Sequence, residues 1–107
     1  DLAQNDKQKF VILNNKANIY KEQKKHTLAQ TTFQEVYEFN LTIGDSIKIA
    51  RSLDNLGLAK SKLQMPEGID DMMHALDIRK QLNNTELFTS YNHLSEYYLD
   101  RSDVLNV

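Results

Sequence analysis

Hydrophobic side chains recur every three or four residues along almost the whole chain, which is the spacing of one face of an α-helix. The pattern predicts an all-α fold of five helices. The first two cover about residues 6–24 and 27–43, the third starts near Ser46, the fourth runs over 66–84, and the fifth covers about 85–101. Each helix is expected to bury one apolar face against its neighbours. The residues expected to be largely buried are Leu13, Ala17, Phe33, Leu53, Leu56, Gly57, Met72, Ala75, Leu76, Tyr91 and Leu94.

Short turn signals separate these helical segments. Gly44 and Asp45 follow the second segment and read as a C-cap and a turn, because glycine adopts the left-handed backbone of a helix end at low cost. Ser46 is a suitable N-cap for the third segment. Pro66 is tolerated best in the first turn of a helix and therefore indicates the start of the fourth.

The helical segments repeat. Residues 51–57 align with residues 89–95 at a separation of 38 residues, and residues 13–17 align with residues 53–57 at a separation of 40. A helix–turn–helix unit that recurs at about this length is typical of a solenoid of stacked helix pairs. Small residues such as Ala17 would let paired helices approach closely.

The residues at these repeated positions carry a family resemblance. They are Leu13, Ala17, Tyr20, Ala29, Phe33 and Val36 in the first pair, Leu53, Leu56, Gly57, Gly68, Met72 and Ala75 in the second, and Tyr91, Leu94, Ser95 and Tyr98 in the last segment. The pattern resembles the tetratricopeptide repeat family, and its long period resembles the repeats of kinesin light chains and of bacterial peptide-sensing regulators. Two departures are Lys16, where leucine is expected, and Met72, where an aromatic residue is expected.

The resemblance implies a fold and a function. It implies a right-handed α-α superhelix of antiparallel helix pairs over residues 1–107, with pairs at about 6–43 and 46–84 and a lone helix at about 85–101. It also implies a non-catalytic module that binds a peptide or a protein, as the sensor or scaffold part of a larger bacterial signalling or transcription-regulatory protein. Residue 1 is Asp rather than Met, so we expect a segment of a longer protein or a mature chain without its leader.

Polar residues follow the repeated positions Leu13, Leu53 and Tyr91 and form the candidate binding site. They are Asn14, Asn15 and Asn18 in the first repeat, Asp54 and Asn55 in the second, and Asn92 and His93 in the third. An amide side chain offers both a donor and an acceptor, which suits the backbone of an extended peptide. In the resembled modules an asparagine ladder holds the peptide, and the resemblance places Asn15, Asn55 and His93 in its slots. The alternative is that this face is simply solvated.

The same family contains chaperone adaptors that hold a ligand carboxylate with lysine and arginine. The corresponding positions of the inner face here are Asn14, Thr89 and His93, none of which is basic. The resemblance therefore does not predict a chaperone C-terminal carboxylate as the ligand.

The chemistry-bearing residues do not predict an enzyme, a cofactor or a metal site. The chain has no cysteine, so it can form neither a disulfide nor a thiolate zinc site. The three histidines, His26, His74 and His93, fall in separate segments without metal-ligand spacing. Asp70 and Asp71 are adjacent, so on a helix they point about 100° apart and cannot share a substrate atom.

Charge and hydropathy bear on the partners. Residues 1–26 hold six lysines, but these are spread along a helical pattern without arginine, which favours a solvated face over nucleic-acid binding. The longest aliphatic and aromatic run, residues 10–13, is too short to cross a membrane. The lack of cysteine fits a reducing compartment, so we expect a cytoplasmic location. A last helix without its partner would expose apolar residues and favour homo-oligomers through the open ends, the main alternative to peptide binding.

Overall fold

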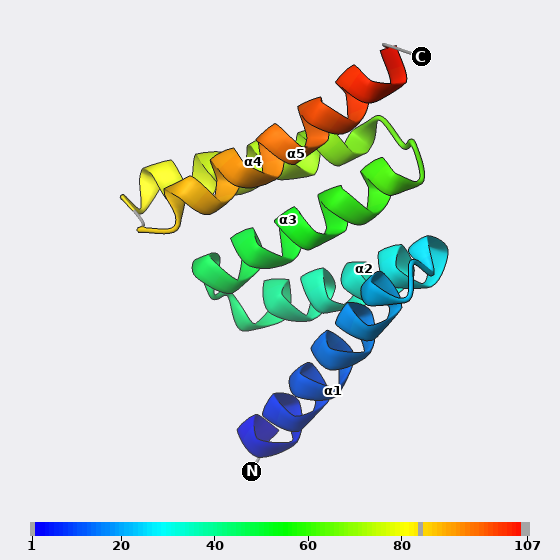
Figure 1. Cartoon of the computed structure of the whole chain (residues 1–107). Helices are drawn as coiled ribbons and strands as arrows, with labels where there is room; N and C mark the ends of the chain where they lie inside the picture. Colours follow the sequence, from blue (N-terminus) through cyan, green and yellow to red (C-terminus); the bar gives the residue numbers. More distant parts are fainter. Residues whose placement is uncertain (1, 84, 106–107) are drawn as a thin grey trace.

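The computed structural model describes residues 2–83 and 85–105, with side chains for residues 5–83 and 85–100. This part of the chain is helical and contains no β-strand, which confirms the all-α prediction. The helices are α1 (Leu2–Glu22), α2 (His26–Ile43), α3 (Ser46–Lys62), α4 (Glu67–Gln81) and α5 (Leu87–Leu105) (Figure 1). None of the described helices is long and apolar enough to cross a membrane.

The turns agree in part with those predicted from the sequence. Gly44 has a left-handed backbone, with φ of 79°, and caps α2 as predicted. The N-cap of α3, however, is Asp45 and not Ser46. The Asp45 carboxylate accepts hydrogen bonds from the backbone N–H groups of Ile47 and Lys48 at 3.1 and 3.2 Å, which satisfies two of the free donors at the helix start.

Helices α1, α4 and α5 have bounds that differ from those expected. α1 begins at Leu2, four residues before the predicted start, and ends at Glu22, two residues before the predicted end. α4 ends at Gln81, three residues before the predicted end at Asn84, which lies outside the described residues. Asn83 has φ of 50°, and this left-handed backbone cannot continue a right-handed helix. α5 begins at Leu87, two residues later than Thr85.

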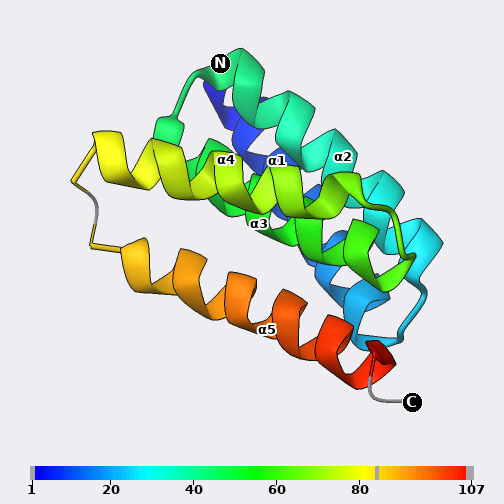
Figure 2. The ribbon, with the colours of Figure 1, turned by 90° about the horizontal axis from the view of Figure 1, so that it is seen from above.

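The five helices form two layers. Figures 1 and 2 show α1, α3 and α5 on one side of the molecule and α2 and α4 on the other, with each helix running back along the one before it. α3 lies in the middle and contacts α2, α4 and α5. The molecule is elongated, with principal extents of 54 × 33 × 18 Å, so the layer of α1, α3 and α5 presents a long face.

The core lies on either side of α3. Ala17, Ala29, Phe33 and Leu56 join α1, α2 and α3, and on the other side Leu58, Met72, Leu76, Leu94 and Tyr97 join α3, α4 and α5. Most residues predicted to be buried are buried, whereas Leu13 is half-buried. The prediction for Tyr91 is wrong: it is 50% exposed, because α5 directs Leu94 and Tyr97 toward α4 and Tyr91 away from it.

Two glycines let α3 and α4 come into backbone contact. A Cβ atom added to Gly57 would lie 2.6 Å from the carbonyl oxygen of Gly68, and one added to Gly68 would lie 2.6 Å from the carbonyl oxygen of Gly57. No side chain fits at either position without moving a helix.

Candidate functional site

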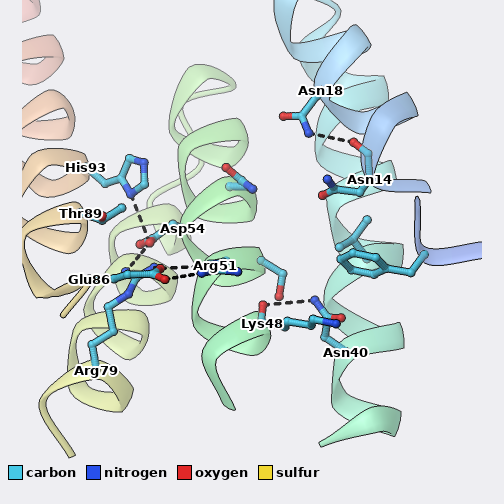
Figure 3. A pocket seen from close by; sticks show the side chains of 14 residues that line it. Asn14, Asn18, Asn40, Lys48, Arg51, Asp54, Arg79, Glu86, Thr89 and His93 are labelled. Atoms are coloured by element: carbon cyan, nitrogen blue, oxygen red, sulfur yellow. Dashed lines mark hydrogen bonds and ion pairs between the residues drawn. The ribbon is translucent and has the colours of Figure 1, made fainter. Parts of the chain in front are cut away.

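A pocket of about 410 Å³ opens on the face formed by α1, α3 and α5 (Figure 3). Side chains of these three helices line most of it, and residues of α2, α4 and the turn before α5 complete it. Its volume falls within the range of about 300–1,000 Å³ that is usual for ligand sites. The pocket brings candidate residues of α1, α3 and α5 together.

Five of the seven candidate residues line this pocket: Asn14, Asn18, Asp54, Asn55 and His93. The other two, Asn15 and Asn92, are exposed and are not among the lining residues. The helical repeat explains the division. Asn14 and Asn18 are four residues apart and share a face of α1, whereas Asn15 is turned away from Asn14 by about 100°, as Asn92 is from His93.

Three half-buried amide groups of the pocket come from α1 and α3. Asn14, Asn18 and Asn55 are half-buried, so each can still reach a ligand. The side-chain N–H of Asn18 donates to the backbone oxygen of Asn14 at 2.9 Å, which orients the Asn18 amide. Figure 3 shows Asn14 and Asn18 across the pocket from His93 and Thr89.

Asp54 has a structural role that its sequence position did not indicate. Its side chain is 1% exposed and forms an ion pair with Arg79, whose side chain is 2% exposed. Arg79 also donates a hydrogen bond to the hydroxyl of Ser90. Asp54 therefore links α3 to α4 and α5, and its paired oxygen is not free for a ligand.

Further charges extend this pair into a network across the pocket wall. His93 Nδ1 lies 3.2 Å from the same carboxylate oxygen of Asp54, a contact that is ionic only when His93 is protonated. Glu86 accepts from Arg51 Nε at 3.0 Å, and its carboxylate lies 3.8 Å from Arg79. The hydrogen bond from Arg51 and the nearby charge of Arg79 lower the pKa of Glu86, and the same hydrogen bond raises the pKa of Arg51.

Three basic residues of the pocket were not among the sequence candidates. Lys48 and Arg51 come from the first two turns of α3, so the pocket carries positive charge although the inner-face positions compared in the sequence are not basic. Lys48 Nζ lies 5.2 Å from the centre of the Phe10 ring. The role of Arg79 could have been recognised in the sequence. Arg79 lies on the same face of α4 as the buried Met72 and Ala75, and a cation on a buried face needs an acidic partner.

Two buried acceptors of the pocket lack a donor. Asn40 donates from its side-chain nitrogen to the backbone oxygen of Lys48 at 3.2 Å, but its side-chain oxygen has no hydrogen-bond partner among the described residues. The same holds for Oδ1 of Asp54. Buried polar atoms normally form hydrogen bonds, so both oxygens are suited to accept from an N–H group that enters the pocket.

The described residues contain no group of three or more His, Asp or Glu side chains that could hold a metal ion. The pocket thus offers hydrogen-bond donors, acceptors and charge.

Comparison with protein-family models, with curated proteins and with solved structures finds no match to this chain. Its function is therefore inferred from the residues of the pocket itself.

Proposed function

We propose that this protein is a non-catalytic module that binds an extended peptide, or a segment of another protein, in the pocket between α1, α3 and α5. The observation that carries the proposal is the convergence of Asn14, Asn18 and Asn55, three half-buried amides from two helices, on one pocket. Asparagine is a modest helix former, so its recurrence within these helices favours a role for its side chain.

A peptide backbone fits the groups of this pocket. It presents N–H and C=O groups in alternation, and the side-chain amides can donate to its C=O groups and accept from its N–H groups. The unpartnered oxygens of Asn40 and Asp54 add acceptors for peptide N–H groups. Each hydrogen bond contributes about 0.5–1.5 kcal/mol net, so useful affinity needs several of them together.

We further propose that the helices are tetratricopeptide-like pairs in a right-handed superhelix, within a sensor or scaffold of a bacterial regulator. Two observations support this fold. Consecutive helices pack as antiparallel pairs, and the first helices of the pairs share one layer that carries the pocket. The proposed regulatory setting rests on the sequence resemblance.

Replacing Asn55 with alanine should weaken peptide binding about tenfold, because the loss removes an amide contact and leaves a peptide group unsatisfied. Asn55 is half-buried and lines the pocket from α3. The test is a peptide selected from a random library on the parent protein, labelled and titrated by fluorescence anisotropy. The melting temperature should change little.

Asn15→Ala is the matched control, since Asn15 is exposed and does not line the pocket. Its affinity for the same peptide should equal that of the parent. An Asn55 variant that binds like the parent would remove this pocket as the binding site. A library that yields no binding peptide would contradict the proposed peptide-binding function.

Self-association is a second candidate function, favoured by the exposed apolar residues of α5. Phe88, Tyr91, Tyr98 and Leu99 are 65, 50, 59 and 64% exposed, whereas Leu94 is buried. Because neighbouring exposed apolar residues favour association, sedimentation velocity should show a mass that rises with concentration. Phe88→Ser with Tyr98→Ser should abolish the rise, and Leu28→Ser, at an exposed site on α2, should leave it intact. A parent that stays monomeric would rule the candidate out.

A further inference from the structure

A second cavity, of about 330 Å³, lies toward the C-terminal end of α3. It is bounded by the turn between α1 and α2, the first turns of α2, the last two turns of α3, and Glu96 of α5. It shares only Asn55 with the first pocket among the residues that line the two. The two cavities are therefore neighbours with different walls.

The floor of this second cavity is apolar and well packed. Ala29, Phe33, Leu58 and Ala59 line it, and all four belong to the buried core. These side chains are held in place by α1, α2 and α4, so the floor is already formed without a ligand. A preformed apolar recess of this size suits the hydrocarbon part of a small molecule.

The rim of the cavity is cationic. Lys21, Lys24 and Lys62 stand around it, and Glu96 is the one acid among the residues that line it. Lys62 is already engaged, because its Nζ lies 2.9 Å from Asp100 and 3.8 Å from Glu96. Lys21 and Lys24 are exposed and form no ion pair within the described part of the chain.

The position of these two lysines is fixed by the turn. Lys24 has φ of 58°, and its backbone N–H donates to the backbone oxygen of Lys21 at 3.1 Å. Lys21, in the last turn of α1, and Lys24, in the turn that follows, thus belong to the α1–α2 wall of the cavity, whereas Glu96 belongs to α5. An anionic group would be attracted to the side of the lysines and repelled from the side of Glu96.

We propose that the second cavity binds a medium-chain carboxylate, with the hydrocarbon chain on the floor of Phe33 and Leu58 and the carboxylate at Lys21 and Lys24. A purely acidic ligand would leave the apolar floor unused, and a neutral apolar ligand would leave the two lysines unpaired. An apolar chain that ends in an anion satisfies both. This site is separate from the peptide pocket, and its test does not depend on peptide binding.

Isothermal titration with a matched set of ligands tests the proposal. Octanoate should bind about fivefold more tightly than octanol, because contacts with exposed lysines are worth up to about 1 kcal/mol. Octylammonium should bind more weakly than octanol. Affinity should rise about fourfold for each methylene from hexanoate to octanoate, as expected when each added group is buried.

The variant Lys21→Gln with Lys24→Gln should lower the affinity for octanoate to that for octanol. The control, Lys7→Gln with Lys80→Gln, removes the same charge from exposed lysines that line neither cavity and should bind octanoate like the parent. Amide shifts on binding should centre on Ala29, Phe33 and Leu58. Equal affinity for octanoate and octanol, no binding of octanoate, or equal loss in both double variants would overturn the proposal.

Discussion

Replacing Arg79 with methionine is expected to lower the free energy of unfolding by about 3–5 kcal/mol, the largest effect of any change considered for this protein. Arg79 and Asp54 are almost completely buried and form an ion pair, and Arg79 also bonds to Ser90. Without the guanidinium, the buried Asp54 charge loses its permanent cation and keeps only His93 Nδ1, at 3.2 Å, beside it. Urea denaturation followed by circular dichroism measures the loss.

Two further variants distinguish the effect of losing the Asp54–Arg79 ion pair from a general effect of substitution on stability. Lys80→Met changes the adjacent, exposed residue and should shift the stability by no more than about 0.5 kcal/mol. Asp54→Leu combined with Arg79→Met removes both charges and should recover most of the loss, since a buried pair can often be replaced by apolar residues. An Arg79 variant as stable as the Lys80 variant would show that the pair contributes nothing.

Replacing Gly57 with valine should destabilise the protein by about 1–3 kcal/mol through overpacking. The added Cβ would lie 2.6 Å from the backbone oxygen of Gly68 and 2.9 Å from Met72 Cγ. The methionine can move but the backbone oxygen cannot, so α4 must shift away from α3. Thermal denaturation should show a clearly lower melting temperature.

Gly57→Ala sharpens this test. Alanine favours a helix over glycine by about 0.5–1 kcal/mol, so a destabilised Gly57→Ala variant would show that the clash outweighs helix propensity. Asp77→Val, at an exposed position of α4, controls for the cost of a β-branched residue in a helix. If Gly57→Ala proved more stable than the parent, the close contact of the two helices would not hold in solution.

Most of the fold could be predicted from the sequence because helix formation and burial follow local periodicity. The spacing of residues such as Phe33 and Met72 identified the faces that form the core, and Gly44 identified a turn. Tyr91 could not be placed in this way. Its burial depends on how α5 is rotated against α4, which is a property of the packed pair and not of either helix alone.

The candidate site was predicted less completely. The repeat located the right turn of each helix, and Asn14, Asn55 and His93 do line the pocket. A shift of one residue turns a side chain by about 100°, however, so the register could not separate these from Asn15 and Asn92. Asp54 was predicted to contact the ligand. Its actual partner, Arg79, lies on a different helix, and one amino-acid sequence does not show which residues pair across helices.

The contact between Gly57 and Gly68 also sets the register of α3 against α4. Sliding one helix by a full turn, about 5.4 Å, would bring a side chain against the backbone of the other at the point of closest approach. The pair consequently has one admissible alignment, and that alignment places Arg79 opposite Asp54. Two residues without side chains thereby determine the position of the charges behind the pocket, although neither glycine is among the residues that line it.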